Sequence, residues 1–274
     1  MDDADRPTPP DLTEWRSEAA HRMASSVVHP IHPTRSAPYD HGATPYAVLL
    51  VTALVGLAGT ALLTFASAEI YDNVTDHNGI SGFDRPVLDQ MIAWRTPARN
   101  SWVTAFTNLG GTRIMPLIAL TAAVLIAWWW RRWTPVLLMV VAGGGSLVMT
   151  VVGKAVIDRA RPDHLLAVAP FESSPSFPSG HSLNAWVVFG MIAYLVGSRL
   201  TSRLATAATV TTASVLAVAM GLSRVYLGHH WLTDVLVAWT LGTAWLFVVF
   251  TGHRLALAVV HSRRRTQTSR LPAS

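Results

Sequence analysis

Residues 114–152 read IMPLIALTAAVLIAWWWRRWTPVLLMVVAGGGSLVMTVV. Two long apolar runs stand on either side of Arg131 and Arg132, and each approaches the ~20 residues that a helix needs to cross the hydrocarbon core of a bilayer. Because lipid offers no hydrogen-bond partners to the backbone, such runs cross as helices. The stretch therefore predicts a helical hairpin in a membrane, with the two arginines at its turn.

The same criterion finds six apolar runs along the chain. They predict spans over residues 46–65, 114–130, 135–152, 182–196, 205–221 and 231–250. The composition agrees, because 51% of the residues are hydrophobic and 14% are charged, against ~25% charged in soluble domains. We expect an all-α fold in which residues 46–255 form an integral membrane bundle of six transmembrane helices. Residues 1–45 are expected to be a polar, disordered cytoplasmic segment, and residues 256–274 a basic cytoplasmic tail.

The segment between the first two runs has apolar residues at helical spacing. They gather around Val87 and around Trp102, with Pro97 between the groups and Gly110 after them. Two short amphipathic helices at the lipid headgroups would give this spacing, and so would a loop whose apolar side chains pack on the bundle. The sequence leaves both interpretations open.

Arginines in the short connections indicate the orientation. Arg131 and Arg132, Arg199 and Arg203, and the basic residues within 254–270 all fall on one side of a six-span arrangement. The positive-inside rule places this side, with both termini, in the cytoplasm. The aromatic cluster of Trp128, Trp129, Trp130 and Trp133 beside Arg131 and Arg132 is typical of a membrane interface.

Three polar clusters interrupt the apolar pattern, and all of them fall on the opposite, extracytoplasmic side. Ionisable residues at membrane depth are costly and usually belong to functional sites. The clusters are Lys154 with Arg161, then Ser179, Gly180 and His181, and finally Arg224 with His230 and Asp234.

His230 and Asp234 are four residues apart and therefore share one face of a helix. The carboxylate can hold one ring nitrogen and leave the other as a nucleophile or base. A metal-binding pair is the competing interpretation. It is disfavoured because only four carboxylates follow Asp89, whereas a magnesium site needs several acidic ligands. We expect no metal and no cofactor.

The cations Lys154, Arg161 and Arg224 would repel one another in a shared pocket unless a multiply charged anion lay between them. A phosphate group meets this requirement, since arginines can bind its oxygens in bidentate fashion. Ser179 and Gly180 precede a helix start, where backbone N–H groups and a hydroxyl can add further donors. The sequence therefore predicts a phosphate site.

Three blocks, Lys-x6-Arg-Pro from Lys154, Pro-Ser-Gly-His over 178–181 and Ser-Arg-x5-His-x3-Asp from Ser223, resemble the signature motifs of the type 2 phosphatidic acid phosphatase family. This family includes vanadium haloperoxidases and glucose-6-phosphatase-like enzymes. The resemblance implies His230 as nucleophile, Asp234 as its orienting partner and His181 as general acid. It implies phosphate binding by Lys154, Arg161, Ser179, Gly180 and Arg224.

The resemblance further implies a metal-independent membrane phosphatase that hydrolyses a lipid phosphate through a phosphohistidine at the extracytoplasmic surface. A Phe-Asp-x-x-Val segment at 83–87, similar to bacterial members, favours a polyprenyl diphosphate such as undecaprenyl diphosphate. Phosphatidylglycerophosphate or phosphatidic acid is the alternative substrate, and phosphotransfer to another acceptor is the alternative reaction.

Partners other than the lipid substrate and the bilayer are not indicated. Nucleic-acid binding is not expected, because the basic residues lie between apolar runs and do not cluster on a soluble face. A transporter is disfavoured because the charges gather at span ends on one face. The oligomeric state stays open.

Other residues near the motifs are predicted to have structural roles. His229 misses the motif spacing and is predicted to be a wall or interface residue. Arg159 and Asp158 are predicted to be a local solvated pair or rim charges. The glycines of the third span, Gly143, Gly144, Gly145 and Gly153, are predicted to let it pack closely on a neighbour.

Overall fold

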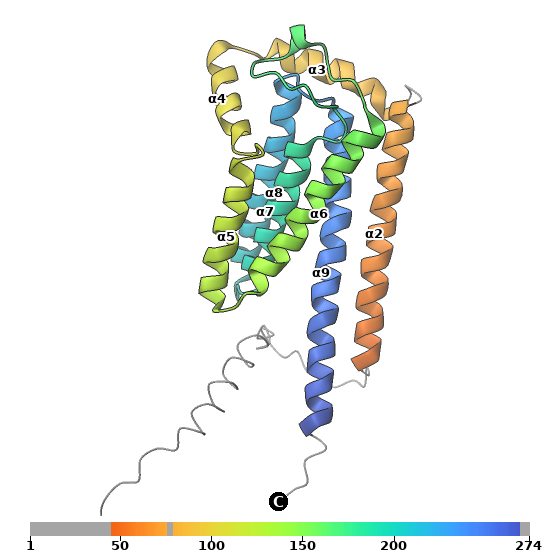
Figure 1. Cartoon of the computed structure of the whole chain (residues 1–274), viewed down its shortest axis with the longest axis vertical. Helices are drawn as coiled ribbons and strands as arrows, with labels where there is room; N and C mark the ends of the chain where they lie inside the picture. The colour runs from red at the N-terminus through yellow and green to blue at the C-terminus, as the bar shows by residue number, and fades with distance from the viewer. Residues whose placement is uncertain (1–44, 76–78, 269–274) are drawn as a thin grey trace, which may run out of the picture.

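The structure is a computed structural model that describes residues 45–75 and 79–268, and these residues contain helices and no β-strand. The six expected spans are α2 (Pro45–Thr75), α5 (Ile114–Trp130), α6 (Thr134–Ile157), α7 (Gly180–Gly197), α8 (Arg203–Tyr226) and α9 (Leu232–Thr268) (Figure 1). Among the described residues, five helices are long and apolar enough to cross a membrane, and α5 is a shorter apolar helix of 17 residues. The predicted all-α membrane bundle is confirmed.

Several helices run beyond the ends predicted from hydropathy. Helix α2 continues ten residues past 65, and α9 continues to Thr268, within the stretch predicted to be a tail. Hydropathy detects the part of a helix that lies in hydrocarbon, whereas the backbone hydrogen bonds can continue through polar residues. The N-terminal segment predicted to be disordered lies outside the described residues, apart from Pro45.

The segment between α2 and α5 forms a short 3-10 turn, η1 (Gly79–Phe83), and two helices, α3 (Asp84–Ala93) and α4 (Pro97–Asn108). The hydroxyl of Thr96 accepts a hydrogen bond from the N–H of Arg99 at 3.2 Å, and Pro97 stands in the first turn of α4, so both residues favour a helix start here. Both helices lie at one end of the bundle (Figure 1), and the Trp102 side chain is 79% exposed. The two short helices of the first interpretation are therefore present.

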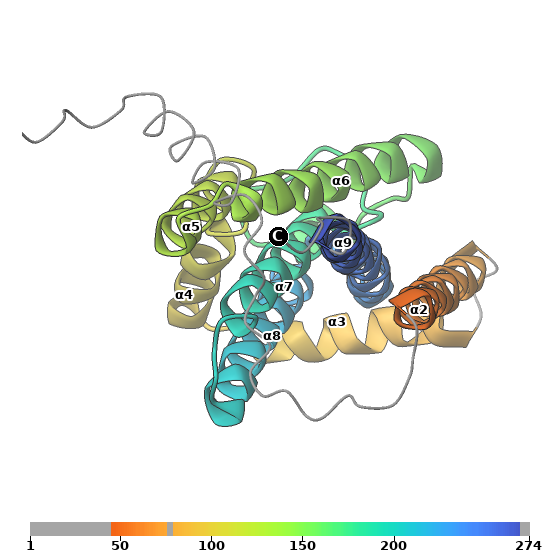
Figure 2. The ribbon, with the colours of Figure 1, turned by 90° about the horizontal axis from the view of Figure 1, so that it is seen from below.

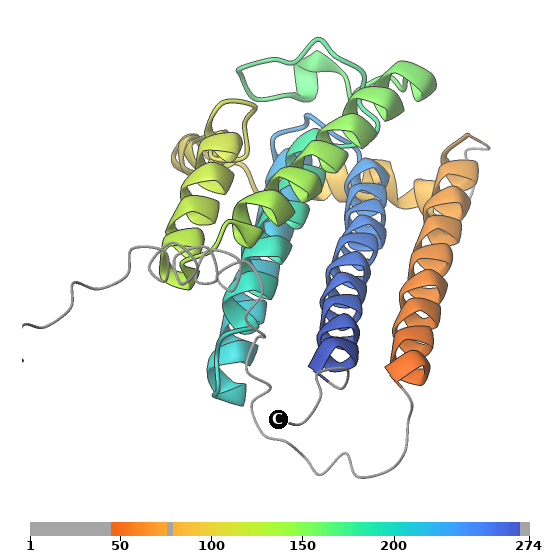
Figure 3. The ribbon, with the colours of Figure 1, turned by 60° about the horizontal axis from the view of Figure 1, so that its bottom comes forward.

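Helix α7 is central and packs against α5, α6, α8 and α9. Its residues Leu183, Val187, Met191 and Leu195 recur every fourth position and are fully buried. Helix α2 packs along α9 at the side of the bundle (Figure 2), and α6 is tilted relative to α9 (Figure 3). The first turn of α7 is therefore surrounded by other elements, which encloses the residues that stand there.

The turns α5–α6 and α7–α8 meet at the end of the bundle opposite α3 and α4. The guanidinium of Arg199 lies 4.5 Å from the ring centroid of Trp130, which joins the two turns. Trp128 and Trp133 are almost fully exposed, as the predicted aromatic belt requires. Trp130 is buried beneath Arg199, so its predicted place in the belt is wrong.

The glycines of α6 fall into two groups. A Cβ on Gly145 would overlap the ring of Trp245, and one on Gly153 would overlap Pro178, so these two allow close packing as predicted. A Cβ on Gly143 or Gly144 would meet nothing within 4 Å, so for these two the prediction is wrong. They line an apolar groove of about 330 Å³ between α5, α6 and α7.

Candidate active site

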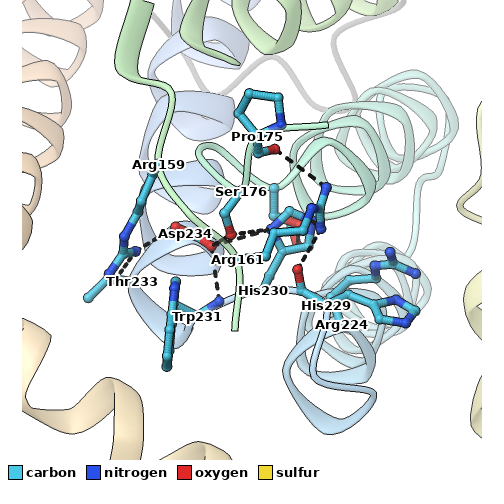
Figure 4. A network of polar contacts seen from close by, with 12 residues as sticks. Arg159, Arg161, Pro175, Ser176, Arg224, His229, His230, Trp231, Thr233 and Asp234 are labelled. Carbon is cyan, nitrogen blue, oxygen red and sulfur yellow. Dashed lines mark hydrogen bonds and ion pairs between the residues drawn. The ribbon is translucent and has the colours of Figure 1, made fainter. Parts of the chain in front are cut away.

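The three polar clusters come together at the end of the bundle where α3 lies. Lys154 stands in the last turn of α6 and Arg224 in that of α8, while His181 stands in the first turn of α7. His230 lies in the turn two residues before α9, and Asp234 lies in the first turn of this helix. The prediction that both residues lie on one helix is therefore wrong, because the helix begins only at Leu232. The loop over residues 158–179, between α6 and α7, brings Arg161 to these residues (Figure 4).

His230 is fully buried between Asp234 and Arg161. Its Nδ1 lies 3.3 Å from Oδ2 of Asp234, and its Nε2 lies 3.2 Å from Nη1 of Arg161. A guanidinium only donates hydrogen bonds, so Nε2 accepts and the ring proton resides on Nδ1. Burial lowers the pKa of His230 to about 4 against the opposing effect of Asp234. The ring is therefore neutral at pH 7, with the Nε2 lone pair facing the cations.

Arg161 and Arg224 hold one carboxylate between them. Nη2 of Arg161 donates to Oε2 of Glu172 at 3.0 Å, and Nη2 of Arg224 donates to Oε1. Although burial opposes ionisation of this carboxyl group, the two guanidiniums lower the pKa of Glu172 to about 2. Glu172 therefore places a negative charge where the sequence predicts an anion between these arginines.

Lys154 and Arg161 both bind the same part of the α6–α7 loop. The ammonium group of Lys154 donates to the carbonyl oxygen of Pro175 and to the hydroxyl of Ser174, and Nε of Arg161 donates to the carbonyl oxygen of Ser174 at 2.6 Å. The loop thus brings Lys154 and Arg161 together, and Arg161 shares Glu172 with Arg224.

Ser179 and Gly180 form the junction between the loop and α7. The hydroxyl of Ser179 lies 2.7 Å from that of Ser182, and its N–H donates to the backbone carbonyl of Asp234 at 3.3 Å. A Cβ on Gly180 would lie 2.9 Å from Cγ2 of Thr150 in α6. Both residues therefore fix the start of α7 against α6 and α9.

His181 borders the same pocket from the side of α5. It lies within electrostatic reach of Arg224, Glu172 and His230. A Cβ on Gly111 would lie 3.9 Å from Nε2 of His181, and Gly111 also lines the apolar groove between α5 and α6. His181 therefore lies where the charged pocket meets the groove.

The predicted solvated pair or rim position is wrong for Arg159. The side chain of Arg159 is only 17% exposed, and its Nη1 donates to Oδ1 of Asp234 at 2.6 Å. Its Nη2 donates to Oδ2 of Asp84 at 2.8 Å, whereas Asp158 ends α6 and is exposed. These two ion pairs could not be predicted from the sequence. Each joins residues 75 positions apart, and they meet only because the loop folds back over the start of α9. The available signal was the scarcity of carboxylates, since each acidic residue in apolar surroundings needs a partner.

Ser176 was not predicted to belong to the site, whereas His229 was predicted to form part of its wall. The hydroxyl of Ser176 donates to Oδ2 of Asp234 beside His230. The ring of His229 is buried, and its Nε2 lies 2.7 Å from the carbonyl oxygen of Val168, so it forms part of the wall.

The pocket thus combines a neutral imidazole whose Nε2 lone pair faces Arg161, two guanidiniums that bind an anion, and a second imidazole. Within the part of the chain that the structure describes, no three His, Asp or Glu side chains are grouped as metal ligands. The arrangement suits attack on an anionic group whose charge is neutralised by fixed cations.

Comparisons with known proteins agree with this chemistry. A family model described as "PAP2 superfamily" matches residues 132–257. A protein from Bacillus subtilis (strain 168), named phosphatidylglycerophosphatase B, is 37% identical over 174 residues, which cover 63% of this chain and 84% of that protein.

Two solved structures are similar to a large part of the chain. A crystal structure described as the first transmembrane PAP2 type phosphatidylglycerolphosphate phosphatase from Bacillus subtilis is 30% identical, with a TM-score of 0.62 over 73% of this chain and 96% of that chain. The structure of Aquifex aeolicus LpxE, at 20% identity and a TM-score of 0.50 over 61% of this chain and 94% of that chain, shares the fold. The chain therefore belongs to the PAP2 superfamily, as a lipid phosphatase of the membrane.

Proposed function

We propose that this chain hydrolyses the phosphate of a membrane lipid through a phosphohistidine at His230. The observation that carries the proposal is the convergence of Arg161 and Arg224 on one carboxylate beside Nε2 of His230. Guanidiniums bind carboxylate and phosphate oxygens in the same bidentate manner. A substrate phosphate that replaces the Glu172 carboxylate would bring its phosphorus next to the nucleophile.

In the proposed reaction, Nε2 of His230 forms a bond to phosphorus and the bond to the ester oxygen breaks. His181 gives its proton to the leaving oxygen, and then takes one from the water that cleaves the phosphohistidine. Throughout the reaction, the carboxylate of Asp234 accepts a hydrogen bond from the Nδ1–H of His230. Lys154, Arg161 and Arg224, with the hydroxyl of Ser179 and the N–H of Gly180, would stabilise the charge on the equatorial oxygens.

The apolar groove supports a lipid as the substrate. Met115 and Ala123 of α5 line it and are eight residues apart, so it follows the helix for about 12 Å. This is close to one leaflet of a hydrocarbon core of ~30 Å. Gly111 lines its end next to His181, so a chain lying in the groove would hold its phosphate near the cations.

Phosphatidylglycerophosphate is the first substrate that we propose, and a polyprenyl diphosphate such as undecaprenyl diphosphate is the second. The name of the Bacillus subtilis relative supports the first. The second rested on the segment 83–87, but Asp84 binds Arg159 and Thr233 inside the protein. These internal contacts of Asp84 weaken the support that the segment gives to the second substrate.

We further propose that the site faces the extracytoplasmic side and that both termini are cytoplasmic. The support is the position of Arg131 and Arg199 at the turns of the opposite end of the bundle, together with the positive-inside rule. The substrate would then come from the outer leaflet.

The test is phosphate release by the purified protein in detergent with excess EDTA. The panel contains phosphatidylglycerophosphate, phosphatidic acid and a polyprenyl diphosphate, each with and without orthovanadate. We expect turnover of at least one lipid in EDTA and its loss with vanadate, which mimics the pentacoordinate phosphorus of the transition state. Activity that EDTA removes and magnesium restores would contradict the proposal. Transfer of the phosphate to a lipid or sugar acceptor, without free phosphate, would identify a phosphotransferase.

A further inference from the structure

A second network of charges lies behind His230, on the side away from the phosphate pocket. The guanidinium of Arg159 bridges two carboxylates. Its Nη1 lies 2.6 Å from Oδ1 of Asp234 (Figure 4), and its Nη2 lies 2.8 Å from Oδ2 of Asp84. Its Cζ lies 5.7 Å from the ring centroid of Trp231, which packs the guanidinium on an aromatic face. Arg159 thus connects helix α3 to the carboxylate that contacts the nucleophile.

Asp84 also binds the start of α9 directly. Its Oδ1 accepts the backbone N–H of Thr233 at 2.9 Å, and its Oδ2 accepts the hydroxyl of Thr233 at 2.7 Å. The first N–H groups of a helix have no partner within the helix, and a carboxylate there is favoured by the helix dipole. Asp84 therefore fixes the turn of α9 that carries Asp234.

Every oxygen of Asp234 is occupied. Oδ1 accepts from Arg159, while Oδ2 accepts the N–H of Trp231 at 3.0 Å and the hydroxyl of Ser176 and lies 3.3 Å from Nδ1 of His230. The side chain of Asp234 has no exposed surface. A buried carboxylate held on both oxygens cannot rotate away from the imidazole, so its direction toward Nδ1 is fixed by its neighbours.

We propose that Arg159 and Asp84 are positioning residues that hold Asp234 ionised and aimed at Nδ1 of His230. Arg159 supplies the charge and Asp84 keeps the guanidinium in place. This inference rests on the proposed role of His230 as nucleophile. It assigns to Arg159, which the phosphate site does not use, an effect on turnover through Asp234.

Removal of the guanidinium has a defined electrostatic consequence. In Arg159→Gln, the negative charge of Asp234 is no longer balanced, so protonation of His230 becomes easier and its pKa rises. The acid limb of kcat/KM then moves to higher pH. The charged and titratable groups that face His230 from the other elements are unchanged in this variant: Arg161 and Glu172 of the loop, His181 of α7 and Arg224 of α8.

The experiment measures kcat, KM and the pH profile of kcat/KM for four variants. All four act on the same lipid substrate, so that titration of the substrate contributes equally to each profile. For Arg159→Gln we expect kcat to fall about 10- to 100-fold, by analogy with the loss of a hydrogen-bond partner that orients a metal ligand, with KM within about twofold. Arg159→Lys retains the charge and should leave the acid limb in place, with a smaller loss of kcat. Asp84→Asn should lower kcat without moving the acid limb of kcat/KM to higher pH. The double variant Arg159→Gln with Asp84→Asn balances the charges again and should return the limb toward wild type.

Matched controls lie on the same helix α3. Arg85 and Asp89 form an exposed ion pair, so Arg85→Gln and Asp89→Asn change the same residue types without touching Asp234. Both should retain wild-type kcat and the wild-type acid limb.

Two results would overturn the inference. One is wild-type kcat in Arg159→Gln when His230→Ala is inactive. The other is an equal loss of kcat in Arg159→Gln and Arg159→Lys with an unmoved acid limb, which indicates a purely structural role. An active His230→Ala variant would instead contradict the proposed nucleophile, so the two failures are distinguishable.

Discussion

The carboxylate of Glu172 forms an ion pair with the guanidinium of Arg224 in the pocket that we assign to the substrate phosphate. The Glu172 side chain is 30% exposed, whereas that of Arg224 is 2% exposed, so the carboxylate can leave toward solvent while the arginine stays. A phosphate must displace this carboxylate to reach His230, and the protein's own anion therefore competes with the substrate.

Replacement of Glu172 by Gln should tighten anion binding at pH 7. The neutral amide competes less for Arg161 and Arg224, and we expect the inhibition constant of orthovanadate to fall about tenfold, which corresponds to about 1.4 kcal/mol. Asp158→Asn is the control, because Asp158 is exposed at the end of α6. Unchanged or weaker vanadate inhibition in Glu172→Gln would show that the carboxylate does not occupy the phosphate site.

His230→Ala should abolish turnover in a folded protein, with a loss of several orders of magnitude in kcat, because the group that forms the bond to phosphorus is gone. The neighbouring His229→Ala is a matched control. It removes a buried imidazole of the wall that bonds to Val168, and it should retain most of the activity. Activity of His230→Ala within tenfold of wild type would contradict the assignment.

The proposed role of His181 as general acid predicts a dependence on the leaving group. An alkoxide needs a proton as it leaves, whereas a nitrophenolate with a pKa near ~7 hardly does. In His181→Ala, kcat/KM should therefore fall more for the lipid monoester than for p-nitrophenyl phosphate. Equal losses on both substrates would indicate that His181 binds phosphate and donates no proton.

The groove between α5 and α6 can be filled without disturbing the packing around it. A side chain at Gly144 meets open space, so Gly144→Phe should block the groove while α6 stays in place. We expect KM for a long-chain lipid phosphate to rise about tenfold, with kcat/KM for p-nitrophenyl phosphate unchanged. Gly252→Phe on α9 is the control, since that position also meets nothing within 4 Å. Equal effects of both variants on the lipid would argue against chain binding in the groove.

The proposed orientation can be tested in cells, because the chain contains no cysteine. Single cysteines at Ser173, in the exposed part of the α6–α7 loop, and at Thr201, in the exposed α7–α8 turn, report on opposite ends of the bundle. A membrane-impermeant thiol reagent should label intact cells at 173 and leave 201 unlabelled. The reverse pattern would place the active site in the cytoplasm.

The sequence by itself determined the spans and the three polar clusters. A run of apolar residues long enough to cross lipid folds as a helix whatever its neighbours are, because its hydrogen bonds are local. His230 and Asp234 are also close in sequence, so the turn at the start of α9 is enough to bring them into contact. For this reason the bundle and the contact between these two residues could be predicted before any tertiary contact was known.

The tertiary structure decided which partners complete the site. Arg159 reaches Asp84 and Asp234 because the α6–α7 loop folds over the starts of α3 and α9, and these contacts join residues 75 positions apart. The same holds for the glycines of α6, where Gly145 packs on Trp245 but Gly144 faces a groove. Neighbouring residues of one helix point in different directions, and only the positions of the other helices determine whether each direction meets a side chain or open space.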